Sequence, residues 1–511
     1  MNWTLAGLVV AAGLAVALPG TGQIPTMWWG LPATGSAGAP LAGGAEGSEE
    51  LRPPSAEAPT AERRRPGRRP AEAVLPPAAA LGEGALRSGA GGDPAADLLA
   101  HLDGSARRLV AETLERNPGL ARARFQASAA AQRPPQAATL PDPRAEVSLF
   151  ALPPETRVGP QRLSVSLWQR LPARGRRSLE SSVLEFEAAT ADARVAAARL
   201  ELVTETRRRA YELAFLALRR AILVHEKEHL ESHELLARAR YAAGAGLQQG
   251  VLKIQAAITR SEQKLLQVEM MHRAQLAALN RLRDRPASSS AEIVELPEPR
   301  ALTLDGVALR QVAAAKRPEL RAVGASLRAA QHQVRLAGKE SSPNFDIGLA
   351  YTLVDRRRDV LGRATPPQGN GNDILSLSAS VNLPVWNRRL SAALEEALAA
   401  ESAARELERS TRTQIEAQLG ELEARLPLLY EQWFLFEHVL RQQAEEALRS
   451  AESAYATGHL NALDLLEAEH MLFDVQNGAI RTRADWAIAW GELEGAVGGS
   501  VPLEEVQNGQ G

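Results

Sequence analysis

The chain has 511 residues, with 61 acidic and 59 basic side chains and a formal net charge of −2. This length allows a large core, and the balanced charge argues against a nucleic-acid-binding protein, which normally carries a basic excess. The chain contains no cysteine, so we expect no disulfide, thiolate metal site, cysteine nucleophile or acylated cysteine. Aromatic residues make up only 4%, while Ala, Leu, Arg and Glu dominate. This composition is typical of long helices and coiled coils.

Residues 1–18 are predicted to be a signal peptide. Leu5–Leu18 is an apolar run that ends in the small-residue sequence Ala15-Val16-Ala17, which suits a cleavage site. A mis-chosen start or a buried strand is the alternative interpretation. No run of about 20 apolar residues occurs, so we expect no membrane-spanning helix in the mature chain.

Residues 19–97 are predicted to be a disordered arm. They contain 12 of the 31 prolines and 14 of the 39 glycines of the chain. Such a segment cannot bury enough apolar surface to offset the entropy lost on ordering. Five arginines between positions 63 and 69 would contact an anionic surface or form a solvated basic linker.

The remainder of the chain is a tandem duplication. Four sequence anchors recur in the same order after roughly 200 residues, which is the signature of a repeated unit. We predict a first repeat at 98–285, a linker at 286–302, a second repeat at 303–498 and a tail at 499–511. The paired anchors are Asn117-Pro118 with Arg317-Pro318, Asp142-Pro143 with Ser342-Pro343, Leu171-Pro172 with Leu383-Pro384, and Tyr241-Ala242-Ala243-Gly244 with Tyr455-Ala456-Thr457-Gly458.

Each repeat is predicted to contain two strands, at 143–152 and 162–171 in the first repeat and at 344–354 and 374–383 in the second. Apolar and small polar residues alternate along them; for example, Leu375 and Leu377 share one face while Ser376 and Ser378 share the other. This pattern suits transmembrane barrel strands, although a water-soluble hairpin with one wet face shows it too. Four strands cannot close a barrel, so membrane insertion would require oligomerisation.

Long helices follow the strands in both repeats. Residues 176–243 contain neither Gly nor Pro, which permits a helix about 100 Å long. The equivalent run at 387–457 is interrupted only by Gly420 and Pro427. Rods of this length suit coiled-coil pairing into a tube; a filamentous scaffold is the alternative. The fold class is therefore α+β, mostly α.

This ordered set of motifs, found twice, resembles the TolC-like outer-membrane efflux channel family over about residues 100–498. The resemblance implies a homotrimer in the bacterial outer membrane, in which each chain gives four strands to a 12-stranded barrel and the helices form a periplasmic tunnel. It also implies two partners, a periplasmic adaptor (membrane fusion) protein and an inner-membrane pump of the resistance-nodulation-division type. Many relatives carry an acylated cysteine, which this chain lacks, and the long arm is not part of the family pattern.

The same resemblance implies site residues at the helix turns. Tyr241, Gly244, Tyr455 and Gly458 would form the adaptor-docking turns. Asp464 and Glu467 would form the acidic gate, since positions i and i+3 of a helix share a face and rings of carboxylates select cations. The alternative is that they are ordinary exposed acids.

The two repeats differ at the gate positions. The first repeat has Gly250 and Lys253 where the second has Asp464 and Glu467, so the gate would be asymmetric. Glu469 lies off the gate face, and we expect its removal to have little effect.

Residues 383–389, Leu-Pro-Val-Trp-Asn-Arg-Arg, are similar to the heavy-metal, cobalt-zinc-cadmium type branch of the family. Membership of that branch would imply metal cations as substrates. The sequence leaves open whether the substrate is a metal ion, a drug or another small molecule.

A histidine cluster lies in the first long helix. His225 and His229 match the H-E-x-x-H pattern of zinc sites, and His233 follows one turn later. The host is a long charged helix without a third-ligand pattern, so a metalloprotease is disfavoured. A cation-binding face and a solvated polar face remain the alternatives.

The sequence contains no P-loop, nucleotide fingerprint or nucleophile elbow. We therefore expect no enzymatic activity and no cofactor, and a duct that depends on its partners for energy. The opposing hypothesis is a secreted or periplasmic coiled-coil scaffold without a pore.

Overall fold

The computed structural model describes residues 93–102 and 104–501, all within one compact unit that spans Pro70–Gly511. The predicted signal peptide and residues 19–92 of the predicted arm lie outside the described residues. Among the helices of the described residues, none is both long enough and apolar enough to cross a membrane.

The first repeat contains short helices, strands and two long helices, in the predicted order. Its elements are α2 (Pro94–His101), α3 (Gly104–Arg116), α4 (Pro118–Ala131), α5 (Arg133–Ala138), β1 (Arg144–Leu149), β2 (Glu155–Thr156), β3 (Gly159–Leu171), α6 (Arg176–Ala242) and α7 (Gln248–Leu282).

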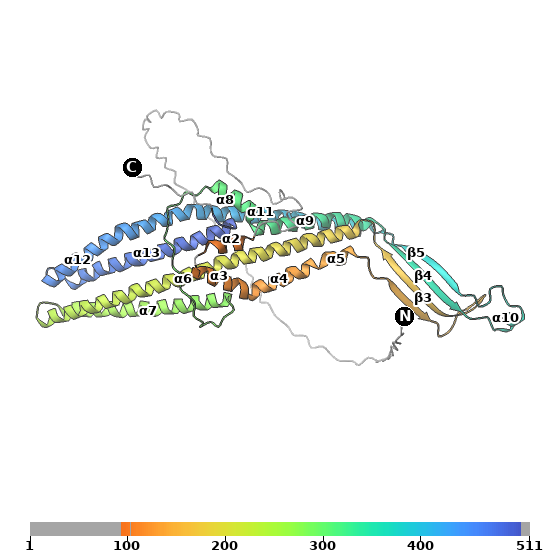
Figure 1. Ribbon diagram of the computed structural model, residues 1–511, viewed down its shortest axis with the longest axis horizontal. Coiled ribbons are helices and arrows are strands. Elements are labelled where there is room, and N and C mark those ends of the chain that lie inside the picture. Colours follow the sequence, from red (N-terminus) through yellow and green to blue (C-terminus); the bar gives the residue numbers. More distant parts are fainter. Residues whose placement is uncertain (1–92, 103, 502–511) are drawn as a thin grey trace, which may run out of the picture. The chain divides into compact units, whose positions relative to one another are not determined.

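The second repeat has the same order. Its elements are α8 (Gly306–Lys316), α9 (Pro318–Gly338), the 3₁₀ turn η2 (Lys339–Ser341), β4 (Phe345–Val354), α10 (Val360–Ala364), β5 (Ile374–Val381), α11 (Asn387–Phe434), the π-helical segment η3 (Leu435–Leu440), α12 (Arg441–Thr457) and α13 (Ala462–Val497). The mostly helical fold with a small antiparallel sheet is as predicted (Figure 1).

One boundary of the predicted arm is wrong. Residues 94–97, which the composition places in the disordered arm, form the first turn of α2. The Asp93 side chain accepts a hydrogen bond from the Ala95 amide, which satisfies a free helix donor. Ala95 and Leu98 are fully buried, so the burial of apolar surface offsets the cost of ordering this segment.

The Asn-Pro anchor begins a helix for a local reason. Asn117 Oδ1 accepts from the Leu120 amide at 2.9 Å, and Pro118 occupies the first helical turn, where no amide donor is needed. Asn117 Nδ2 also donates to the Leu282 carbonyl at the end of α7. In the second repeat Arg317 stands before α9 without a side-chain cap, so only the proline signal is shared.

The strands form an antiparallel sheet in the order β1-β3-β4-β5, and the two-residue strand β2 also pairs with β3. The β3–β4 pairing joins the two repeats, with Leu167 opposite Leu349. Leu349 in turn faces Leu377 of β5. Register therefore places the apolar residues of all four main strands in common rows on one face.

That apolar face is uncovered in the single chain. Leu149 is 79% exposed and Leu377 is 77% exposed. Large apolar side chains on this face that are also exposed include Val147, Val165, Leu167, Phe345, Ile347, Leu349, Tyr351, Leu375 and Val381. A contiguous apolar surface of this kind marks a site of contact with a membrane or a partner.

The polar face of the sheet contains a close packing contact. Trp168 lies opposite Gly348 in the register. A Cβ at Gly348 would fall 2.5 Å from the Trp168 ring, so only glycine leaves room for the indole. Packing of the indole therefore explains why a glycine stands inside this strand.

Helix α6 is the element on which both repeats pack. It is 67 residues long and contacts α7 of its own repeat and α9 and α13 of the second. Leu200, Leu223 and Leu230 of α6 belong to three successive buried clusters along its length, two of which also contain second-repeat residues. Part of the core is thus shared between the repeats.

The second long helix is less regular than the first. Pro427 lies inside α11 without ending it, and the π-helical segment η3 follows eight residues later. A π-helical turn changes the phase of the side chains. The predicted run 387–457 is therefore helical throughout but consists of three segments.

A buried ion pair joins the repeats. Arg207 of α6 donates to Glu494 of α13 at 2.6 Å, and their side chains are only 5% and 9% exposed. Each charge is desolvated, so removal of one leaves the other uncompensated.

We therefore expect Glu494→Ala to lower the free energy of unfolding by about 3–5 kcal/mol. Glu269→Ala, which removes the partner of Arg273 on the solvent side of α7, should change it by about 0–1 kcal/mol. Thermal unfolding of the detergent-purified proteins, followed by circular dichroism, measures both. Equal losses in the free energy of unfolding would mean that the buried ion pair stabilises the fold no more than the exposed one.

Candidate functional site

Two helix turns lie at the end of the long helices opposite the sheet (Figure 1). The α6–α7 turn contains Gly244, whose φ of 72° is favourable for glycine but not for other residues. The Ala245 amide donates to the Arg240 carbonyl at 2.9 Å and closes the turn. Tyr241 is about half exposed on the last turn of α6.

The α12–α13 turn is built in the same way. Gly458 has φ 88° and ends α12, and the His459 amide donates to the Ala454 carbonyl at 2.9 Å. Such a left-handed glycine lets the chain reverse directly after the helix. Asn461 then begins α13 by accepting from the amides of Leu463 and Asp464.

Arg240 connects the two turns. Its guanidinium donates to the Tyr455 carbonyl, lies 4.7 Å from the centre of the Tyr455 ring, and is close to Gly458. Tyr455 is buried, whereas its repeat counterpart Tyr241 is exposed. The sequence does not single out Arg240, because one arginine near a turn gives no signal that it will contact another turn.

A cavity of about 610 Å³ lies between the turns. Asp464 lines it, together with the cationic side chains Arg240 and Lys253. Asp464 is half-buried, while Glu467, one helical turn further on, is exposed. The cavity thus brings together Asp464 and Lys253, while Glu467 is not among its lining residues.

The histidine cluster lies farther along α6, where the helix packs on α13. His225 is exposed and His229 half-buried, while His233 is buried. Glu226, the base position in an H-E-x-x-H site, is buried instead against Lys264 at 3.3 Å and His470 at 3.8 Å. This arrangement differs from both a protease site and a fully solvated face.

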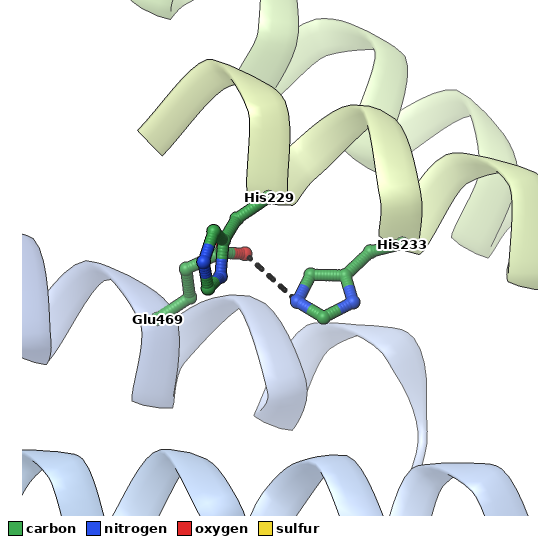
Figure 2. A group of neighbouring side chains, drawn as sticks. All are labelled: His229, His233 and Glu469. Carbon is green, nitrogen blue, oxygen red and sulfur yellow. Dashed lines mark ion pairs between the residues drawn. The ribbon is translucent and has the colours of Figure 1, made fainter. Parts of the chain in front are cut away.

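The structure places Glu469 in the contact between α6 and α13. Glu469 is not a surface charge but fully buried, with its carboxylate 4.0 Å from His229 Nδ1 and 3.6 Å from His233 Nε2 (Figure 2). Burial, followed by the nearby charges of Glu226 and Glu452, raises the pKa of Glu469 to about 8. Burial also lowers the pKa of His229 and of His233.

Residues 309–499 match the family model "Outer membrane efflux protein". No curated protein sequence matches the chain.

Several solved outer-membrane proteins share the fold. The outer membrane protein VceC from Vibrio cholerae has a TM-score of 0.64 at 22% identity, covering 77% of this chain and 96% of its own. The outer-membrane channel OprN has a TM-score of 0.66 at 17% identity, covering 85% of this chain and 98% of the OprN chain. CusC has a TM-score of 0.64 at 14% identity, covering 80% of this chain and 98% of the CusC chain. Residues 309–499 are therefore similar to the outer membrane efflux protein family, and the described chain has the fold of the TolC-like outer-membrane channels.

Proposed function

We propose that the protein is the outer-membrane component of a tripartite efflux system. Three copies form a passive duct with a periplasmic tunnel, which takes substrates from a periplasmic adaptor and an inner-membrane pump of the resistance-nodulation-division type and releases them outside. The chain acts without a cofactor or enzymatic step.

The uncovered apolar face of the sheet is the observation that carries this proposal. Its rows of exposed leucine, valine and aromatic side chains run across all four main strands, which suits contact with lipid. β1 and β5 stand at the ends of the strand order, so each has one edge without a partner strand among the described residues. Pairing of these edges between neighbouring chains would give 12 strands in a trimer and leave no free edge.

The helix turns are the proposed contact with the adaptor. They lie at the end of the long helices opposite the lipid-facing sheet, where a periplasmic partner would meet the tunnel. Tyr241, Gly244, Tyr455 and Gly458 shape these turns, and Arg240 holds the first turn against Tyr455.

Asp464 and Glu467 are the proposed gate. Three copies would place six carboxylates near the periplasmic end, where their negative charge attracts cations. Lys253 and Arg240 line the same cavity as Asp464 and are basic partners for it.

Metal cations are the proposed substrate class, because residues 383–389 are similar to the heavy-metal branch. The fold gives no further support, since the solved structures are only 14–22% identical and share the fold alone. The second candidate, a coiled-coil scaffold without a pore, rests on the length of α6 and is opposed by the uncovered apolar sheet.

Fractionation followed by native mass measurement of the detergent-extracted complex tests the duct. We expect a trimer in the outer-membrane fraction. A monomer or dimer in the periplasmic fraction would overturn the proposal and favour the scaffold.

Replacement of Leu377 by Arg, on the proposed lipid face, should cost about 2–4 kcal/mol near the middle of the bilayer and reduce assembled trimer. Ser378→Arg is the matched control on the neighbouring position of the same strand, which faces the lumen, and it should be tolerated. Trimer yield in outer-membrane extracts measures both, and equal losses would contradict the assigned faces.

The double change Asp464→Ala and Glu467→Ala should raise single-channel conductance in planar bilayers, because the closed arrangement loses its bridging cations and basic partners. Cation preference should fall, and block by divalent cations should weaken by about tenfold or more.

Glu445→Ala with Glu446→Ala is the matched control for the gate. It removes the same number of charges from an exposed part of α12. Equal effects from the two double variants would show that general surface charge, and not a gate, controls conduction.

Gly458→Phe should leave trimers in the membrane but abolish cross-linking to the adaptor and efflux. A side chain in this left-handed conformation costs about 1 kcal/mol or more, and its Cβ would lie 3.2 Å from Arg240 Nη2. Gly244→Phe should act in the same way through its own positive φ.

Gly420→Ala is the control, because this glycine lies inside α11 with open space around it. It should preserve both cross-linking and efflux. Normal cross-linking of the Gly458 and Gly244 variants would refute a docking role for the turns.

A further inference from the structure

The buried carboxylate of Glu469 lacks the partners that a buried acid normally has. Among the described residues, neither of its oxygens has a hydrogen-bond partner, and the residue is 0% exposed. His233 is 8% exposed, and its Nε2, which is directed at Glu469, also has no hydrogen-bond partner (Figure 2). Buried polar atoms are normally hydrogen-bonded, so a cluster of three such atoms requires a physical reason.

The geometry is that of a ligand set. His229 and His233 lie at i and i+4 of α6, so their rings project from one face of the helix toward Glu469 on α13 (Figure 2). One ligand atom from each of the three residues lies within 4.8 Å of the others. Tetrahedral zinc ligands lie roughly 3.3 Å apart, so an inward side-chain movement of about 1 Å would complete the set.

The surroundings favour a cation over an ordinary ion pair. Burial lowers the pKa of His229 and of His233, which favours neutral imidazole, the form that binds metal. Glu226 and Glu452 add negative charge near Glu469 and help raise its pKa. A bound divalent ion would compensate this negative charge.

A fourth ligand and an access route are available. Glu452 of α12 is partly exposed, and its Oε1 lies 3.8 Å from His233 Nε2. The His229 side chain is 34% exposed and borders the solvent. Glu452 or a water molecule could therefore occupy the remaining position.

We propose that His229, His233 and Glu469 bind one divalent transition-metal ion of the Zn²⁺ type per chain and thereby tie α6 of the first repeat to α13 of the second. Two imidazole nitrogens and one carboxylate suit Zn²⁺, whereas Mg²⁺ and Ca²⁺ prefer oxygen ligands alone. The site lies within one chain, so it is independent of trimer formation, transported substrate and channel activity.

Isothermal titration of ZnCl₂ into the full-length protein tests the site. The protein is purified in detergent without a histidine tag and stripped with EDTA, and the absence of cysteine removes thiolates as competing ligands. We expect one Zn²⁺ per chain, little heat with MgCl₂ or CaCl₂, and a higher Tm in the presence of Zn²⁺ because the ion binds only the folded site.

Glu469→Gln and His233→Gln should each weaken Zn²⁺ binding at least tenfold and remove the rise in Tm. His459→Gln is the matched control, since it removes an exposed histidine at the α12–α13 turn and should change neither. Circular dichroism verifies that each variant is folded.

Cobalt gives a second readout. Co²⁺ in place of Zn²⁺ should give the strong visible absorption of a tetrahedral nitrogen–oxygen site in the wild type and in His459→Gln, but not in Glu469→Gln. The proposal is overturned if the folded wild type binds no Zn²⁺. It is also overturned if Glu469→Gln and His233→Gln bind Zn²⁺ as tightly as His459→Gln does.

Discussion

The apolar surface of α6 must be covered along its whole length, and the other helices are arranged to meet this requirement. At 67 residues the helix is too long for α7 alone to cover, since α7 has 35 residues. The clusters around Leu223 and Leu230 are completed by residues of α13 and α12, and α9 packs along α6 nearer the sheet. The clusters around Leu223 and Leu230 therefore need both repeats, because each repeat contributes one side of the same interface.

The sheet follows from the same joining of the repeats. β3 leads into α6 and β4 follows α9, so the packing of α6 on α9 brings these two strands together, and they pair in register. The pairing aligns the apolar residues of both repeats on one face. Much of these rows remains exposed in the described part of the chain, most of all at Leu149 and Leu377. A lipid environment and neighbouring copies would complete a surface that a single chain leaves open.

Local sequence determined most of the secondary structure of this protein. Period-two alternation identified the four main strands, and the absence of Gly and Pro over 176–243 predicted α6 almost to the residue, because these signals depend only on near neighbours in the chain. Duplication predicted the element order. Propensity failed at Pro94–Asp97, where the burial of Ala95 and Leu98 outweighs a Pro/Gly-rich composition, and at η3, for which we find no local signal.

The environment of each site residue was decided by tertiary structure alone. Tyr241 and Tyr455 are equivalent in the repeats, yet only Tyr455 is buried, under Arg240 from the other hairpin. Glu469 has the appearance of a surface acid in sequence, but α13 directs it into the contact with α6, where it meets His229 and His233. Helical periodicity shows which residues share a face. Which face becomes buried, and against what, depends on helices more than 200 residues away in the chain.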